Sequence, residues 1–223
     1  MTDTAAASVR ESYAAKPRYE PPAHYQTVAL HQLLEGTSRW RPNDRSQMVF
    51  LSRLDSSQTA NAVSVFAAGD VSLVKRPCVS VIGTRKVSPE GAARARRAAK
   101  ELAQRGVVVV SGLAEGVDSE AMMAAMASGG RTIGVIGTPL SRAYPAKNAA
   151  LQEEVYRDHL LISQFAEGAS TLRSSFPQRN KLMAFISNAS IIIEASDTSG
   201  TLHQAAECQR LGRWLFIARS VAE

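Results

Sequence analysis

From residue 78 onward, short apolar runs of strand character alternate with segments of helical periodicity. The strand-like runs are rich in β-branched residues and are bounded by turn residues. We expect six strands, at residues 78–83, 107–112, 131–137, 160–165, 189–195 and 213–218. We expect five helices between them, at residues 88–106, 118–130, 148–159, 177–188 and 201–212.

This alternation strongly limits the folds that the chain can adopt. Strands joined through helices pair in parallel, and right-handed crossovers place helices on both faces of the sheet. The sequence therefore predicts an α/β protein with a Rossmann-like, doubly wound and mainly parallel sheet.

The rest of the 223-residue chain is less regular. Residues 1–25 combine Ala, Ser, Pro and charge, which predicts a flexible tail. Residues 26–62 predict a small, partly helical segment, with a short helix at 27–36 and a run at 45–54 that fits either helix or strand. Residues 63–223 are expected to form the Rossmann-like domain.

Targeting and metal-binding signals are weak. No apolar run approaches the roughly 20 residues that cross a bilayer, and the N-terminus has no hydrophobic signal core, so we expect a cytoplasmic protein without a membrane partner. Cys78 and Cys208 fall in or beside expected buried elements, which favours packed thiols. Only His203 has a carboxylate at helical spacing, Glu207. Two groups are too few for a metal site, and we expect neither a metal nor another cofactor.

The charged residues are informative where they gather at one edge of the expected sheet. In open α/β sheets, ligands bind beyond the carboxyl ends of the strands, and five loops are expected there, at 83–86, 111–118, 137–148, 165–181 and 194–201. Their charged residues are Arg85, Lys86, Arg142, Lys147, Arg173, Arg179 and Lys181, with Glu115, Asp118, Glu167, Glu194 and Asp197. Small residues ahead of helix N-termini expose backbone N–H groups to an oxyanion, so these loops together predict a phosphate site. The net charge of +6 favours a polyanionic partner only weakly.

Each loop also has a structural interpretation, because Ser and Thr cap helices and Gly forms tight turns in any α/β protein. The charged segment 94–105 is expected to be a solvated helix face. FPQRNK (176–181) raises a sharper question, since Pro177 at the first helical position would place Arg179 and Lys181 at the positive end of the helix dipole. The two cations are salt-bridged, solvated or part of an anion trap, and we expect them to face the open edge of the sheet.

Two common alternatives to a phosphate site are not indicated. The first loop reads GTRKVSPEG rather than G-x-G-x-x-G, and the second strand ends at Ser111, where a dinucleotide site would place an acidic residue. There is no G-x-S-x-G, and His203 has no evident acid and nucleophile beside it, so a catalytic triad is not expected.

The motifs GTRK, SGLAEGVD, YPAKN, FPQRNK and EASDTSGT, in this order, resemble the DprA/Smf family of DNA-processing proteins, over roughly residues 65–218. The resemblance implies an extended Rossmann fold that forms a homodimer. It implies a protein that binds and protects single-stranded DNA and loads a RecA-type recombinase during DNA uptake and recombination. The candidate residues for binding DNA phosphates are Gly83, Thr84, Arg85, Lys86, Ser111, Gly112, Lys147, Arg173, Arg179, Asn180, Lys181, Ser199, Gly200 and Thr201.

The aromatic residues at this edge are few. Single-strand binders usually add aromatic stacking to phosphate contacts, and the candidates are Tyr144, Phe165 and Phe176. We interpret Tyr144 and Phe176 as packing residues, and therefore expect readout of the DNA backbone to dominate.

The chain departs from the family pattern at three positions. Glu115 stands where the family usually has Arg, Met122 where it has His, and Gln164 in place of a common Glu. These departures indicate a minimal or divergent member, for which DNA binding is better supported than a role in transformation.

Segment 179–207 also resembles the LOG-like nucleotide phosphoribohydrolases, which cleave an N-glycosidic bond with an Arg and a Glu. The double glycine of their loop is missing, and Gln204 holds the carboxylate position. Gln cannot serve as acid or base, and Glu207 lies one helical turn further on. The sequence therefore favours DNA binding without catalysis, with a nucleotide sensor or a nucleotide hydrolase as the alternative.

Overall fold

The computed structural model describes residues 18–41, 44–54, 63–195 and 200–218. These residues form one eight-stranded sheet in the order β1-β2-β6-β5-β4-β3-β7-β8. The strands are β1 (Gln26–Ala29), β2 (Ser64–Gly69), β3 (Cys78–Gly83), β4 (Val108–Ser111), β5 (Thr132–Ile136), β6 (Leu160–Ser163), β7 (Ala189–Glu194) and β8 (Trp214–Ile217).

The sheet is doubly wound, and its fold class is the predicted one. All neighbours from β6 to β8 pair in parallel, whereas β1 with β2 and β2 with β6 are antiparallel. The chain progresses outward from β3 to β6, then returns to place β7 on the other side of β3. The strand order therefore reverses between β3 and β7, and this is where ligands bind in folds of this kind.

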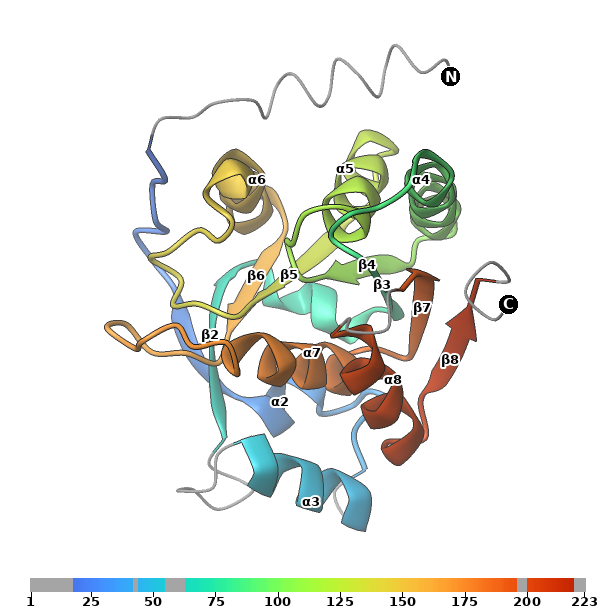
Figure 1. Cartoon of the computed structure of the whole chain (residues 1–223). Helices are drawn as coiled ribbons and strands as arrows, with labels where there is room; N and C mark the ends of the chain where they lie inside the picture. The colour runs from blue at the N-terminus through green and yellow to red at the C-terminus, as the bar shows by residue number, and fades with distance from the viewer. Residues whose placement is uncertain (1–17, 42–43, 55–62, 196–199, 219–223) are drawn as a thin grey trace.

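Helices cover both faces of the sheet, as expected (Figure 1). One layer holds α4 (Pro89–Gln104), α5 (Val117–Ala127) and α6 (Ala149–Asp158). The other holds α2 (Leu30–Leu34), α7 (Ser175–Ile186) and α8 (Thr201–Arg210), with α3 (Arg45–Leu54) beneath them (Figure 1). Short 3-10 turns, η2 (Val71–Lys75) and η3 (Ala146–Asn148), complete the described elements.

Residues 27–29 were expected to be helical, and that prediction is wrong. Together with Gln26 they form β1, in which Thr27 pairs with Phe66 and Val28 with Val65, and the helix begins only at Leu30. Strand β2 was not among the six predicted strands either. Both strands are defined by pairing between segments far apart in the chain, which local sequence periodicity does not predict. A boundary at residue 63 would separate β1 from the strand that it pairs with.

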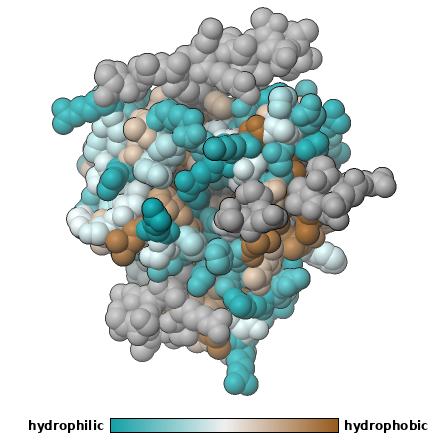
Figure 2. Space-filling view, viewed as in Figure 1, coloured by the Kyte–Doolittle hydropathy of each residue, from teal (hydrophilic) through white to brown (hydrophobic). Residues whose placement is uncertain are grey.

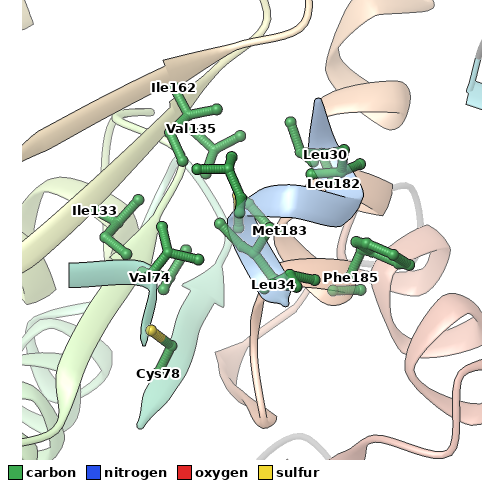
Figure 3. Packing of buried hydrophobic residues seen from close by; sticks show 14 of the residues in the cluster. Leu30, Leu34, Val74, Cys78, Ile133, Val135, Ile162, Leu182, Met183 and Phe185 are labelled. Atoms are coloured by element: carbon green, nitrogen blue, oxygen red, sulfur yellow. The ribbon is translucent and has the colours of Figure 1, made fainter. Parts of the chain in front are cut away.

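The larger part of the core lies between the sheet and the α2–α7 layer (Figure 3). Leu30 and Leu34 of α2 pack with Leu182 and Phe185 of α7 against strand residues such as Val135. Helix α3 joins this core through Phe50, whose ring stacks on Phe185 at a centroid distance of 4.7 Å. The N-terminal segment therefore shares one core with the sheet.

Both cysteines are buried and free, as predicted, and burial raises the pKa of each thiol. In the described part of the chain, none of the helices has the length and apolar character to span a membrane. The same part contains no group of three or more His, Cys, Asp or Glu side chains placed to hold a metal ion.

Candidate nucleic-acid interface

A cleft of about 870 Å³ opens at the carboxyl ends of β3 and β7, where the strand order reverses. In the space-filling view, hydrophilic side chains gather across the middle of this face, and hydrophobic ones gather toward α8 and β8 (Figure 2). The predicted site residues that line the cleft are Gly83, Thr84, Arg85, Lys86, Arg173, Arg179, Asn180, Gly200 and Thr201. The structure thus brings together residues from three of the predicted loops.

The loop after β3 is held tightly against its neighbours. The Thr84 N–H donates to the carbonyl of Glu194 at 2.8 Å, and a Cβ on Gly83 would lie 2.5 Å from the Val117 side chain. Gly116, with φ +76°, brings the next loop to the carbonyl of Thr84, where a Cβ would lie 2.4 Å from the oxygen. Only glycine allows both the left-handed backbone and this close approach. The basic residues that follow Thr84 are therefore carried by a fixed backbone.

Three cations lie exposed around the mouth of the cleft, and none of them forms an ion pair with any described residue: Arg85, Lys86 and Arg173. Tyr144 lies beside them and is 42% exposed. These four residues are called the rim below. Exposed cations with no carboxylate partner among the described residues are available to a polyanion.

Arg179 occupies a different environment at the base of the cleft. Its side chain is 6% exposed, and Nη1 lies 3.6 Å from Oδ2 of Asp118, which is 7% exposed. Nη1 also donates to the carbonyl of Val135 at 3.4 Å, and the Gly112 N–H donates to Asp118 at 3.1 Å. Ser111 is fully buried behind them, and its hydroxyl donates to the carbonyl of Val81 at 2.8 Å. Ser111, Gly112, Asp118 and Arg179 are called the floor below.

The floor depends on the absence of a side chain at Gly112. A Cβ there would lie 1.1 Å from Nη1 of Arg179 and 2.2 Å from its Cζ. The guanidinium therefore sits where any other residue would place its side chain. Packing against Arg179 therefore explains why position 112 is a glycine, whereas the sequence had predicted that Gly112 contacts a phosphate.

Burial and pairing act in opposite directions on the titration of the floor. Burial raises the pKa of the Asp118 carboxyl, while Arg179 and the backbone N–H of Gly112 lower it. Burial lowers the pKa of Arg179, and Asp118 opposes that shift. At both groups burial is the larger influence on the pKa, and the attraction between the two charges offsets part of it.

The cations of FPQRNK do not lie at the open edge, and that expectation is wrong. Helix α7 begins at Ser175, two residues before Pro177, so Arg179 and Lys181 fall in its second turn. Arg179 points into the protein and is salt-bridged. Lys181 is half-buried and does not line the cleft. The sequence left three hypotheses open for these cations, and the salt bridge is the correct one for Arg179.

The opposite end of α7 is anchored by two buried arginines. Arg39 donates to the carbonyl of Ile186, and Arg213 donates to the carbonyl of Phe185 at 3.2 Å. These are carbonyls of the last helical turn, where the dipole is negative and cations are favoured. The anchoring fixes the helix that carries Arg179, Asn180 and the aromatic ring of Phe176.

The N-terminus of α4 is already occupied by a carboxylate of the protein. Ser88 caps the helix and Pro89 begins it, as predicted. Glu194 accepts hydrogen bonds from the N–H and the hydroxyl of Ser88, at 3.0 and 2.6 Å, and lies 3.6 Å from Arg94. A dinucleotide would place its pyrophosphate at this helix N-terminus, where the carboxylate of Glu194 lies in this structure.

The remaining predicted residues that the structure describes, Ser111, Gly112, Lys147 and Lys181, do not line the cleft. Lys147 pairs with Glu115 at 2.7 Å, with both side chains substantially exposed. Gly112 lines a small neighbouring pocket of about 50 Å³ that Glu115, Arg85 and Tyr144 share. Ser199 lies outside the described residues. Among the lining residues, Asn180 is partly committed, because its amide donates to the carbonyl of Gly200 at 2.9 Å.

The sequence did not indicate the partner of Arg179, and the rings of this site were interpreted as packing residues. Asp118 was counted as a charge at the edge, and nothing local indicated that it would lie against Arg179. Tyr144 and Phe176 were interpreted as packing residues, yet both line the cleft. Asp118, Tyr144 and Phe176 could have been predicted as neighbours, because all three follow strands whose carboxyl ends lie at the same edge of the sheet.

Comparison with known proteins gives the family. The family model described as DNA recombination-mediator protein A matches residues 47–222. The chain belongs to this family. DNA processing protein DprA of Streptococcus pneumoniae is 39% identical over 154 residues, which are 69% of this chain and 54% of the relative. Protein Smf of Synechocystis is 31% identical over 175 residues, 78% of this chain and 41% of the relative. The chain thus spans about half the length of the curated relatives that it matches.

Two solved structures of the family are similar over most of the chain. The X-ray structure of DprA from Streptococcus pneumoniae has a TM-score of 0.70 at 31% identity, covering 87% of this chain and 63% of that one. DprA from Helicobacter pylori, whose structure is described as showing a single-stranded DNA binding mode, has a TM-score of 0.69 at 28% identity, covering 87% and 80%.

The structure shows the surroundings of the three residues that depart from the usual DprA pattern. Glu115 neutralises Lys147 beside the cleft. Met122 is fully buried in the core of the α5–α6 side. The Gln164 amide donates to Gln178 of α7 at 3.2 Å. Of the three, only Glu115 changes the charge next to the rim.

Proposed function

We propose that this chain binds single-stranded DNA in the cleft between β3 and β7. The observation that carries the proposal is the group of three exposed cations, Arg85, Lys86 and Arg173, without carboxylate partners in the described structure. Each neutralises one phosphate and releases counterions, which gives affinity without sequence preference. The candidate phosphate contacts narrow to these cations and the polar lining formed by Gly83, Thr84, Asn180, Gly200 and Thr201.

The orientation of the nearby elements supports the same proposal. Helix α8 begins at Thr201 on the wall of the cleft, so the positive end of its dipole faces the site. Among the described residues of the cleft lining, the two carboxylates are both engaged, Asp118 with Arg179 and Glu194 with Ser88 and Arg94. The uncompensated charge of this described lining is therefore positive.

The test is binding of a labelled single-stranded oligonucleotide and of the matching duplex across a salt series. Three phosphate contacts with a single strand predict a slope of about −2 for log K against log salt concentration. We expect the single strand to bind more tightly than the duplex. Absence of binding at low salt, or equal binding of both, contradicts the proposal.

We further infer, from the family's description as recombination mediators, that the bound DNA is passed to a RecA-type recombinase. The measurement is DNA-dependent nucleotide hydrolysis by the recombinase on single strands coated with a single-strand-binding protein. Addition of this chain should shorten the lag before hydrolysis begins. An unchanged lag at saturating chain contradicts a loading role but leaves DNA binding intact.

We also infer a homodimer, as the family resemblance implies. Edge strand β8 supports this, since Trp214, Phe216 and Ile217 are 74%, 54% and 48% exposed in the single chain. An edge strand with exposed apolar side chains favours pairing with another chain. The molar mass in solution, measured by light scattering across a concentration series, checks it.

Hydrolysis of nucleotides is the weaker alternative. Gln204, at the position of the hydrolase carboxylate, is fully buried and donates to Ser190 at 3.0 Å. Glu207 is buried and pairs with Arg210 at 2.6 Å, away from the cleft. We therefore infer binding without catalysis. Release of free base from AMP, lost in Gln204→Ala, would reverse this inference.

A further inference from the structure

The first described residues of the chain lie against a loop that leads to the cleft. Residues 18–25, called the strap below, contain no helix or strand and run beside α6 and the loop at 137–145 (Figure 1). The match to the family model begins at residue 47, so the strap precedes it. Pro21 and Pro22 restrict its backbone. A segment before the family match thus lies close to the candidate site.

Tyr19 connects the strap to the loop. Its hydroxyl donates to the carbonyl of Leu140 at 2.8 Å and accepts from the amide of Gln152, also at 2.8 Å. The same amide donates to the carbonyl of Arg142 at 3.4 Å. Burial raises the pKa of the Tyr19 hydroxyl, so it stays protonated and able to donate at neutral pH. Strap and helix together therefore hold the middle of the loop.

Helix α6 presents two almost completely buried polar side chains to the strap. Gln152 and Glu153 are each 1% exposed. The carboxylate of Glu153 accepts from the N–H of Glu20 at 2.9 Å, and Tyr156, one turn further on, donates to the carbonyl of Glu20 at 2.8 Å. A buried polar group that loses a partner costs free energy, so the strap supplies bonds that these groups of α6 need.

The loop held by the strap carries part of the cleft wall. Tyr144, four residues after Leu140, lines the cleft. Between these two positions the chain forms a turn, in which the N–H of Arg142 donates to the carbonyl of Pro139 at 3.0 Å. The hydroxyl of Thr138 donates to the carbonyl of Arg142 at 2.7 Å. These bonds fix the turn internally, so a bond to Leu140 from outside positions the whole turn and the residues after it.

We propose that Tyr19 is a positioning residue of the DNA site, which through Leu140 holds the loop where Tyr144 lines the cleft. The inference rests on the proposed function and extends the site to a segment that precedes the family match. Tyr19 is not among the described residues that line the cleft, so it acts through the loop. A loop that is ordered before DNA arrives does not have to be ordered on binding, and this increases affinity.

The test is Tyr19→Phe in the full chain, which keeps the ring and removes the hydroxyl. Loss of one such hydrogen bond predicts about twofold to tenfold weaker binding of labelled oligo-dT, by fluorescence anisotropy. The slope of affinity against salt should stay that of the wild type, because no phosphate contact is lost. In the absence of DNA, amide hydrogens of residues 138–144 should exchange faster in the variant.

Tyr156→Phe is the matched control. It also removes a hydroxyl that bonds to the strap, but it leaves the bond between Tyr19 and Leu140 in place. Affinity for oligo-dT and hydrogen exchange in the loop should both remain those of the wild type.

A double-mutant cycle shows whether Tyr19 acts through Tyr144. In the Tyr144→Ala background, adding Tyr19→Phe should weaken binding no further. Unchanged affinity or unchanged exchange in Tyr19→Phe, equal effects in Tyr156→Phe, or additive losses with Tyr144→Ala overturn the positioning role while DNA binding stands. If the wild type binds no single strand at low salt, the proposed function itself fails, and the role of Tyr19 in it fails as well.

Discussion

The floor and the rim of the cleft contain the same kind of residue in opposite situations. Arg179 of the floor is 6% exposed, is paired with Asp118 and overlaps the space that a side chain at position 112 would need. Arg85 of the rim is exposed and has no carboxylate partner among the described residues. A buried cation whose charge is already balanced serves the fold, whereas an exposed, unbalanced one serves a ligand. A basic motif is therefore evidence of anion binding only once the burial and the pairing of its side chains are known.

The largest effect that would test the comparison is expected from Asp118→Ala. The substitution leaves Arg179 charged and buried without its partner, which costs about 3–5 kcal/mol of unfolding free energy. Urea denaturation measures the loss. Glu115→Gln is the matched control, because it breaks the exposed ion pair with Lys147, and such pairs contribute about 1 kcal/mol or less. Similar losses in the two variants would mean that the buried pair of the floor contributes no more to stability than an exposed ion pair.

Gly112→Ala is expected to follow in size. Its Cβ would overlap the guanidinium of Arg179, and overpacking of this kind costs about 1–3 kcal/mol. The same change in an Arg179→Ala background should cost far less, since the overlapping group is gone. A double-mutant cycle on unfolding free energies measures this coupling. Additive losses would show that position 112 is restricted by something other than Arg179.

The sequence predicts the central sheet well and the environment of its charges poorly. Strands β3 to β8 are predicted by their apolar, β-branched runs. The start of α4 is likewise predicted locally, by the cap residue Ser88 and by Pro89. Strand β1 is four residues long and half-exposed, and only its pairing with β2 defines it. The sequence does not distinguish Arg85 from Arg179, because Arg179 is buried against Asp118, which belongs to a different loop. Local sequence patterns do not predict contacts between loops.

Loss of charge at the rim should affect DNA affinity and leave stability almost unchanged. Arg85→Ala and Arg173→Ala should each weaken binding of single strands and reduce the steepness of the salt dependence by about 0.7. Because both side chains are exposed, the free energy of unfolding, measured by thermal denaturation, should change by less than about 0.5 kcal/mol. Arg105→Ala removes the same charge from the far end of α4, where the side chain is 67% exposed, and is the control. Equal loss of affinity in Arg105→Ala would mean that net charge, and not the rim, attracts DNA.

The smallest effect concerns Lys147, which belongs to neither region. Its ammonium lies 2.7 Å from the carboxylate of Glu115, and Glu115 lines the small pocket that also contacts Arg85 and Tyr144. Glu115→Gln removes this carboxylate charge, frees Lys147 for a phosphate and makes the potential beside the rim more positive. We expect the affinity for single strands to rise about two- to fivefold at low salt, and the gain to vanish at high salt because exposed charges are screened.

Glu101→Gln provides the matched comparison for this last change. Glu101 pairs with Arg105 at 3.5 Å on the outer helix face, so the substitution changes the net charge equally at a distance from the cleft. A larger gain for Glu115→Gln than for Glu101→Gln, by anisotropy titration, places Lys147 within reach of the DNA. A loss of affinity in Glu115→Gln would mean instead that Glu115 positions Lys147 for binding. The carboxylate of Glu115 would then orient the ammonium of Lys147 toward the DNA, unlike Asp118, whose charge balances that of the buried Arg179.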